Sequence, residues 1–373
     1  RLNRAQQGSY KVDATRSAIF LPRTRAFPDN TEVEAIVSST GEQKIDDKGK
    51  PVSDILSTVV PDTNSVTVHL HHSFIRLPDD TEEPRPFDAR AGMIGLSWDN
   101  DGFIDYAVPI GEPIQLQYGR RHRLQKKDPQ AEVSEAVEPI IYYLDPGAPE
   151  PVRSALMEGA SWWNQAFEAA GYKDAFQVKL LPEGADPMDV RYNVIQWVHR
   201  STRGWSYGSS IFDPRTGEIL KGHVTLGSLR VRQDYLIAEG LLAPYTKDQV
   251  PDMMLEMSLA RIRQLSAHEV GHTIGMEHNF AASVNDRSSV MDYPFPLITL
   301  DKDNNIDLSN AYGTGIGAWD KRTVAYAYQD FPDDADELAQ RRRILDETIP
   351  VSYTHLTLPT INGECSCRGG GGE

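Results

Sequence analysis

The residues best suited to chemistry lie between His268 and His278, in the stretch HEVGHTIGMEH. His268 and His272 are four residues apart, so on an α-helix they share one face, about 6 Å apart along the axis. Two imidazoles at this spacing can bind one zinc ion at about 2.0–2.1 Å each. Glu269 follows the first histidine, where it can reach a metal-bound water without binding the metal itself.

The third histidine sets a condition on the helix that carries the other two. On a continued helix, His278 would lie about 15 Å along the axis from His268, too far away to share a metal. We therefore expect the helix to end near Gly275, because glycine best adopts the left-handed conformation at a helix C-terminus. The chain can then fold back and bring His278 to the metal.

The pattern H-E-x-x-H-x-x-G-x-x-H resembles the zinc signature of the metzincin metallopeptidases. The stretch SVMDYP at residues 289–294 is similar to the Met-turn of that clan, in which Met291 would be structural support and not a ligand. The resemblance implies one catalytic Zn²⁺ held by His268, His272 and His278. A zinc-activated water would then hydrolyse a peptide bond, with Glu269 as general base.

Tyr293 matches the Met-x-Tyr arrangement of some metzincins. The resemblance implies that it is a metal ligand or an oxyanion donor, and simple packing beneath the site is the other interpretation. We expect the protein or peptide substrate to lie extended along an edge strand, at residues 206–212 or 219–226, and to pair through its backbone.

A wider resemblance covers nearly all of residues 1–350 and is to bacterial zinc-dependent metallopeptidases with an uncharacterised β-rich N-terminal domain. It rests on stretches such as WWNQAFEAAG at 162–171, DPMDVRYN at 186–193 and DPRTGEI at 213–219. The family resemblance alone implies an exported protein, located in the periplasm, on the cell surface or outside the cell.

The composition limits the class of protein. The chain has 373 residues, 39% hydrophobic and 25% charged, which is enough for two domains with cores of their own. A formal net charge of −16 argues against a nucleic-acid or anionic-membrane partner. No apolar run reaches the roughly 18 residues of a membrane span. Because the chain starts at Arg1, we expect it to be a piece of something longer.

The C-terminal stretch fits no fold. Residues 351–360, VSYTHLTLPT, resemble a translated sequencing adapter, and a glycine-rich end follows. We expect residues 351–373 to be a non-native tail. Both cysteines, Cys365 and Cys367, lie in it, so the rest of the chain has no disulfide and its redox compartment is undecided.

The predicted fold class is α+β. Residues 1–120 read as a β-rich domain, with strands at 17–21, 33–37 and 65–70, and residues 121–138 read as a charged, solvated linker. Residues 139–350 are expected to form a metzincin-like domain with a mixed twisted sheet, an active-site helix, a Met-turn and C-terminal helices. Its predicted strands lie at 139–144, 176–181, 190–198, 206–212 and 219–226, and its helices at 149–170, 229–240, 252–276, 319–328 and 333–348.

Four further features have a functional and an ordinary interpretation. His69 and His71 would share a strand face as metal ligands, and His223 is a further candidate, but ordinary strand histidines are favoured in both cases. The stretch DKDNNID at 301–307 has calcium-loop spacing without the glycine at position six or the acid at position twelve, so a solvated turn is favoured over Ca²⁺. Asp88 could block the zinc in a latent form, although an ordinary loop aspartate is favoured.

Two rival functions remain open at this point. One is a zinc-containing binding or scaffold module without catalytic turnover, and the other is a zinc hydrolase acting on another class of substrate. The presence of Glu269 argues against the first, and the metzincin pattern disfavours the second.

Overall fold

The computed structural model describes residues 7–52, 55–79, 81–96, 103–112, 114–200, 205–243, 252–284, 287–332 and 334–347. The chain divides into two compact units. Unit 1 comprises Arg1–Leu77 and Met188–Val190, and unit 2 comprises Pro78–Pro187 and Arg191–Glu373. The tail predicted at residues 351–373 lies outside the described residues.

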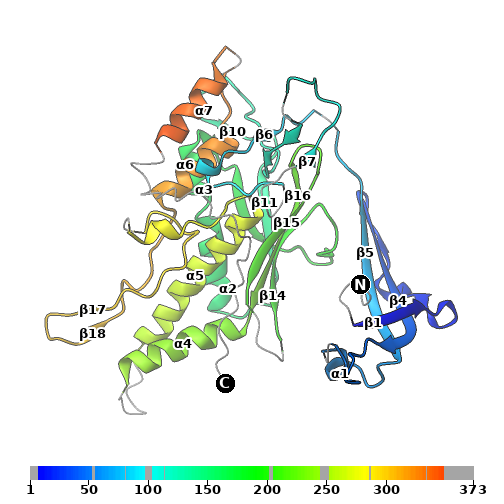
Figure 1. Cartoon of the computed structure of the whole chain (residues 1–373). Helices are drawn as coiled ribbons and strands as arrows, with labels where there is room; N and C mark the ends of the chain where they lie inside the picture. The colour runs from blue at the N-terminus through cyan, green and yellow to red at the C-terminus, as the bar shows by residue number, and fades with distance from the viewer. Residues whose placement is uncertain are drawn as a thin grey trace. The chain divides into compact units, whose positions relative to one another are not determined.

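Unit 1 is β-rich, as predicted for the start of the chain. The long strands β4 (Asn30–Gln43) and β5 (Ser65–Ile75) pair antiparallel and contain the strands predicted at 33–37 and 65–70. Three shorter strands also pair with β4, namely β1 (Gly8–Val12), β2 (Ala18–Ile19) and β3 (Arg25–Ala26) (Figure 1). With helix α1 (Ile55–Val59), they enclose a small core of Tyr10, Leu56 and Val66.

Unit 2 is built on a five-stranded sheet. The strand order is β13 (Phe176–Leu180), β11 (Ile140–Leu144), β14 (Asn193–Val198), β16 (Ile219–Gly227) and β15 (Tyr207–Phe212). The first four strands run parallel, and β15 runs antiparallel at the edge. The mixed sheet predicted from the sequence is therefore present.

Six helices of unit 2 are α2 (Val152–Ser161), α3 (Asn164–Ala169), α4 (Leu229–Leu242), α5 (Met253–Thr273), α6 (Ala318–Tyr328) and α7 (Glu337–Asp346). Helices α2 and α5 pack against each other, and α5 also packs on β15 and β16 (Figure 1). Among the described residues, no helix is both long and apolar enough to cross a membrane.

The remaining elements of unit 2 are short. Antiparallel pairs join β6 (Arg85–Pro86) to β9 (Tyr118–Gly119), β7 (Phe103–Ile104) to β8 (Gln115–Leu116), and β17 (Thr299–Leu300) to β18 (Ile306–Asp307). Strand β10 (Ser134–Glu135) pairs parallel with β12 (Tyr172–Lys173). The 3₁₀ helices η3 (Ala89–Ala91) and η5 (Phe280–Val284) complete this set.

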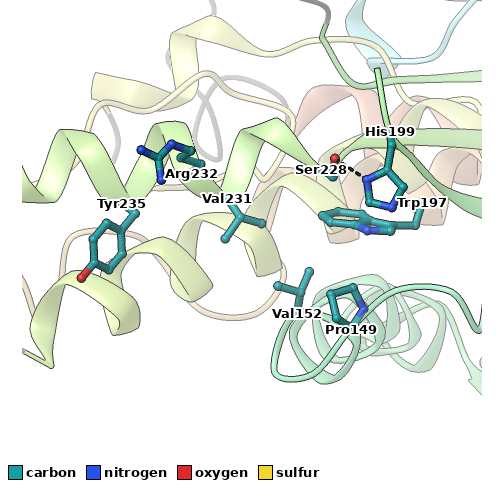
Figure 2. A pocket seen from close by; sticks show the side chains of 8 residues that line it. All are labelled: Pro149, Val152, Trp197, His199, Ser228, Val231, Arg232 and Tyr235. Atoms are coloured by element: carbon teal, nitrogen blue, oxygen red, sulfur yellow. Dashed lines mark hydrogen bonds between the residues drawn. The ribbon is translucent and has the colours of Figure 1, made fainter. Parts of the chain in front are cut away.

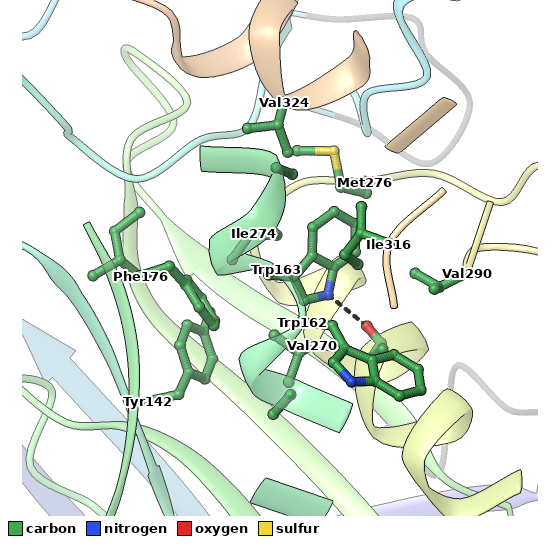
Figure 3. Packing of buried hydrophobic residues seen from close by; sticks show 14 of the residues in the cluster. Tyr142, Trp162, Trp163, Phe176, Val270, Ile274, Met276, Val290, Ile316 and Val324 are labelled. Carbon is green, nitrogen blue, oxygen red and sulfur yellow. Dashed lines mark hydrogen bonds between the residues drawn. The ribbon is translucent and has the colours of Figure 1, made fainter. Parts of the chain in front are cut away.

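The helix predicted at 149–170 is broken into α2 and α3 at Trp162 and Trp163. Trp162 N–H donates to the Gly159 carbonyl, three residues back, so the last turn of α2 is tighter than an α-helix. Trp163 is fully buried, and its indole N–H donates to the Ala267 carbonyl at 2.7 Å (Figure 3). Both tryptophans belong to the core, and the break positions Trp163 against α5. Its replacement by alanine would cost about 3–5 kcal/mol.

The segment around residues 121–138 differs from the solvated linker predicted there. Arg121 and His122 are buried, and Arg121 forms an ion pair with Glu82. Lys126 is buried as well, and its ammonium donates to the carbonyls of Ala131 and Glu132 at 3.0 Å each. Because its charges are paired inside the protein, this segment packs within unit 2, and the compact units divide earlier, between Leu77 and Pro78.

Candidate active site

Helix α5 ends where the third histidine requires it to end. Its last residue is Thr273, and Gly275 has a φ of 92°, in the left-handed region. The Gly275 N–H donates to the His272 carbonyl at 3.2 Å, and the Met276 N–H donates to the Gly271 carbonyl at 2.9 Å. These two bonds form a Schellman motif, so the predicted stop near Gly275 is confirmed.

A second constraint excludes any side chain at Gly275. A Cβ atom there would collide with the carbonyl oxygen of Arg120. On the same turn, the Ile94 N–H donates to the Gly275 carbonyl at 2.8 Å, and Met93 forms a β-bridge with Met276. Segments from much earlier in the chain therefore fix the turn that leads to His278.

The last carbonyls of α5 receive hydrogen bonds from buried tyrosines. Tyr142 donates to the Thr273 carbonyl at 3.1 Å, and Tyr328 donates to the Ile274 carbonyl at 2.7 Å. His122 lies 3.1 Å from the Tyr142 hydroxyl through Nε2 and donates its backbone N–H to the Tyr328 hydroxyl at 3.0 Å. Carbonyls that a helix end leaves without partners are thus satisfied inside the core. Burial lowers the pKa of His122 to about 4, so this imidazole is neutral at pH 7.

The three predicted histidines come together. One ring nitrogen from each of His268, His272 and His278 lies within 4.8 Å of the other two. The Nε2 atoms of His272 and His278 are 3.0 Å apart, and the buried Nε2 of His268 has no hydrogen-bond partner among the described residues. Among those residues, this is the one such group of potential metal ligands.

Backbone carbonyls set the tautomers of two of these rings. His268 Nδ1 lies 2.9 Å from the Val290 carbonyl, and His272 Nδ1 lies 2.9 Å from the Met276 carbonyl. A carbonyl only accepts, so each ring carries its proton on Nδ1 and directs the Nε2 lone pair into the cluster. Hydrogen bonds of this kind orient histidines that bind metals.

The charge state of the cluster fits a divalent metal. Burial lowers the pKa of His268 well below its usual value and that of His272 to about 4, so both rings are neutral at pH 7. Converging lone pairs of neutral imidazoles repel one another unless a cation lies between them. Nitrogen donors without a carboxylate are a ligand set that Zn²⁺ accepts. The residues present therefore fit a single zinc ion.

The predicted Met-turn packs against the same helix. Met291 is almost fully buried, and a side chain at Gly271 would collide with its Sδ atom and with the Trp163 ring. Gly271 precedes His272, so this glycine lets Met291 support the helix beside a histidine of the cluster. The interpretation of Met291 as structural support agrees with this packing.

Gln264 links the Met-turn to α5 and was not predicted from the sequence. Its Nε2 donates to the Val290 carbonyl at 2.9 Å, the carbonyl that also accepts from His268. The buried guanidinium of Arg261 donates to Gln264 Oε1 and so fixes the orientation of this amide. A sequence signal existed, because Gln264 lies one helical turn before His268 on the same face.

Asp320, at the start of α6, holds the Met-turn from the other side. Its Oδ1 accepts from the Ser289 hydroxyl at 2.6 Å, and its Oδ2 accepts from the backbone N–H groups of Val290 and Gly317 at 2.9 Å each. Burial raises the pKa of Asp320 to about 6 despite these three donors. The only sequence signal was its place as an acid in the first turn of a helix that begins after a glycine.

Glu269 lies against the edge strand of the sheet. It is only 5% exposed, and burial raises its pKa to about 7, against opposing effects from Arg261 and from a hydrogen bond with the Gly208 backbone. A side chain at Gly208 would collide with the Glu269 backbone, so β15 passes closely along α5 at this point. A carboxyl group with this pKa can accept and return a proton near neutral pH.

Tyr293 completes the cluster. Its hydroxyl lies 2.8 Å from His278 Nε2, and its ring centroid lies 4.9 Å from that of His268. The residue is half exposed, so its hydroxyl faces both the histidines and solvent. Phe280 stacks on the His278 ring at 5.3 Å and on the Tyr293 ring at 5.4 Å, a contact that sequence reasoning did not predict.

The other histidines pair elsewhere. His69 Nδ1 lies 2.6 Å from a Glu34 carboxylate oxygen, and His71 Nε2 lies 2.5 Å from Glu32. His223 Nε2 lies 2.9 Å from the Gln196 side-chain oxygen. These contacts agree with the ordinary interpretation of all three as strand residues.

The two remaining acidic candidates are engaged locally. The Asp88 carboxylate accepts from the Arg90 guanidinium at 2.8 and 3.0 Å and from its backbone N–H, so it caps η3 and does not approach the histidines. These contacts agree with the ordinary interpretation of Asp88 as a loop aspartate. Asp301 accepts from the backbone of Asp303 and Asn305 and closes the turn between β17 and β18, as a solvated turn would.

Comparisons with known proteins agree with this site. A family model described as Met-zincin matches residues 251–355, and one described as a domain of unknown function, DUF5117, matches residues 1–127. No curated protein matches the chain.

Two solved structures show weak likeness. Archaemetzincin from Methanopyrus kandleri has 13% identity and a TM-score of 0.22, over 60% of this chain and 98% of its own. The GM1-bound ECX AB5 holotoxin has 17% identity and a TM-score of 0.28, over 51% of this chain and 80% of its own. Likeness at this level carries no argument about fold or function. The family matches carry more weight: residues 251–355 match a Met-zincin domain of the metzincin type, and residues 1–127 match an N-terminal domain of the DUF5117 family.

Proposed function

We propose that this protein is a zinc-dependent endopeptidase that uses Glu269 as its general base. The observation that carries the proposal is the convergence of three imidazoles whose Nε2 atoms face one another beside a buried carboxyl group. His268, His272 and His278 would hold the metal. When bound, a zinc ion supplies Lewis-acid chemistry and makes water a nucleophile at neutral pH.

Glu269 moves the proton in this proposal. Its carboxylate takes a proton from the attacking water and then gives it to the amine of the leaving peptide. Both transfers are efficient when the pKa lies near the working pH, and burial raises the pKa of Glu269 to about 7. A bound dication would lower this value, and the surrounding apolar core would limit that change.

Tyr293 is proposed to donate a hydrogen bond to the oxygen that becomes negative in the transition state. Its hydroxyl is held 2.8 Å from His278 Nε2 at the exposed edge of the cluster, where a substrate carbonyl can reach it. A preorganised donor of this kind contributes about 2.7–4 kcal/mol to catalysis. Packing alone would need neither the hydroxyl nor this exposure.

The substrate is proposed to add to β15 as a further strand. This strand is the edge of the sheet and passes Glu269 at Gly208. Its outer N–H and C=O groups can pair with an extended peptide and hold the scissile bond beside Glu269. Between the two strands expected to bind substrate, this geometry favours β15, because β16 is already paired on both sides.

The test is cleavage of a mixed peptide library by the zinc-loaded protein and by Glu269→Gln. We expect the variant to keep one zinc per chain and to lose activity by about 10²–10⁴-fold. The matched control is Glu256→Gln, which makes the same change at an exposed position of the same helix and should cleave as the wild type does.

Two results would reject the proposal. Cleavage by Glu269→Gln at the wild-type rate would remove the assigned base. A chain that binds one zinc and cleaves nothing would be the binding or scaffold module considered as the alternative. Export of the protein, inferred from the family resemblance, stays a prediction that fractionation of the producing cells would test.

A further inference from the structure

A cavity of about 370 Å³ lies in unit 2 at the carboxyl ends of β14 and β16 (Figure 2). Trp197 and His199 reach it from the end of β14, and Ser228 follows the last residue of β16. Pro149 and Val152 close it from the start of α2, which follows β11. None of these residues takes part in the candidate active site.

The position of the cavity in the sheet is one that binds ligands in other open α/β sheets. The chain leaves β11 for β13 on one side, and β14 lies on the other side of β11. The sheet therefore changes its winding direction between β11 and β14. Ligands bind outside the carboxyl ends of the strands at such a point.

The walls of the cavity are apolar. Val152, Val231, Pro149 and the Trp197 ring line it, and the Tyr235 ring lies farther along α4 (Figure 2). Its volume is at the lower end of the range for small-molecule sites, about 300–1,000 Å³. Water is poorly accommodated by such walls, so an apolar group of a few carbon atoms would fill the space favourably.

Polar groups lie at three places around these walls. His199 Nδ1 lies 2.8 Å from the Ser228 hydroxyl at one end. Arg232 shares one face of α4 with Ser228, Val231 and Tyr235, and its guanidinium forms no ion pair with any described residue. The indole N–H of Trp197, in a side chain only 8% exposed, also lacks a hydrogen-bond partner among the described residues.

We propose that this cavity binds a small apolar molecule or terminal residue that carries one carboxylate. The apolar part would lie between Val152, Val231 and Trp197, and the carboxylate would pair with Arg232. An arginine that has no ion-pair partner among the described residues and lies beside an apolar cavity matches such an anion in charge and in geometry, because its planar fork binds a carboxylate through two parallel bonds. The site is separate from the histidine cluster and does not depend on the proposed peptidase activity.

Isothermal titration calorimetry of the full chain with octanoate tests the proposal. We expect saturable binding of octanoate, and binding of its neutral isostere octanamide at least about tenfold weaker, because the charge-assisted pair with Arg232 is lost. N-acetylphenylalanine is the second arm. Tighter binding of this compound would identify the C-terminal residue of a peptide as the source of the ligand, and tighter binding of octanoate would identify a fatty acid.

Two variants locate the site. Arg232→Gln should weaken octanoate about tenfold, whereas Arg342→Gln, at an exposed arginine of α7, should leave its affinity unchanged. Val231→Trp fills the cavity and should abolish binding, and an unchanged unfolding temperature would show that the variant is folded. The proposal is overturned if octanoate and N-acetylphenylalanine both fail to bind at millimolar concentration. Equal affinity for octanoate and octanamide, or binding unaffected by both variants, would overturn it as well.

Discussion

Two groups of histidines in this chain look alike in the sequence and differ in the structure. His69 and His71, the strand group, lie on one face of a strand. His268 and His272 lie on one face of a helix and form the helix group together with His278. Each strand histidine faces a glutamate at 2.5–2.6 Å, so its ring nitrogen already has an acidic partner. The helix histidines face each other and His278 instead, with no carboxylate in the group.

The two groups differ in whether their ring nitrogens are free to accept a cation. In the helix group, backbone carbonyls hold the Nδ1 protons and leave the Nε2 lone pairs directed at one point. In the strand group, the rings are considerably exposed, and no backbone acceptor among the described residues sets their tautomers. A spacing of two residues on a strand and of four on a helix brings the rings close together in both groups. Only fixed tautomers and a lack of competing partners leave a site for a cation.

His272→Ala should remove nearly all zinc binding by the helix group. The variant loses one of three nitrogen ligands, which is about a third of a binding free energy of roughly 10–16 kcal/mol, so zinc affinity should fall about a thousandfold. Metal analysis after dialysis against a weak chelator should give one zinc per wild-type chain and almost none per variant chain. Retention of zinc by the variant would mean that His272 is not a ligand.

His122→Gln should make the stability of the protein less dependent on pH. His122 is a third case, a buried neutral histidine outside both groups. Burial holds the pKa of His122 at about 4, below its unfolded value of 6.5, so the unfolded chain binds an additional proton between these values. The stability from this group is complete above pH 6.5 and is lost as the pH falls to 4, by about 3 kcal/mol in total. Urea unfolding of both proteins across this range should give a shallower pH dependence for the variant. Equal slopes would show that His122 is not the buried neutral group described above.

Gln264→Leu should weaken zinc binding by the helix group without changing any of the three histidines. The variant cannot donate to the Val290 carbonyl, which orients His268. Loss of such an outer partner weakens metal binding by about 10–100-fold. A competitive zinc chelator measures this directly. Gln233→Leu is the matched control, because Gln233 lies on α4 and forms no side-chain hydrogen bond with any described residue. Equal zinc affinities of the two variants would contradict the role given to Gln264.

His71→Ala should have the smallest effect and tests the other half of the comparison. Its partner is Glu32, so its removal should leave the zinc content of the protein at one per chain. The same metal analysis applies. A wild-type content of two zinc ions, reduced to one by this change, would place a second metal in the strand group.

The local parts of the site could be predicted from the sequence. The helix that carries His268 and its end near Gly275 follow from spacing and from the conformational preference of glycine. The five strands of the main sheet of unit 2 were predicted to within three residues, since short buried strands bounded by turns have a clear pattern, whereas the two-residue strands of this unit were not predicted. The α+β class is confirmed by the same elements.

The long-range parts could not be predicted. Gln264 and Asp320 act through backbone groups of the Met-turn that are distant in sequence. Their positions on α5 and α6 could be noticed in the sequence, but their hydrogen-bond partners could not. The break between α2 and α3 depends on where Trp163 meets α5. The basic residues near Arg121 read as solvated because their partners, such as Glu82, become neighbours only in the folded chain.

The turn at Gly275 has a consequence for how this protein can be divided or recombined. It packs closely against the Arg120 carbonyl and accepts a hydrogen bond from the Ile94 N–H. Both residues fall inside the DUF5117 match rather than the Met-zincin match. A fragment cut at the boundary between the two family matches would therefore lose the residues that hold the turn before His278. The two families meet inside one structural unit, so neither can be exchanged as an independent module.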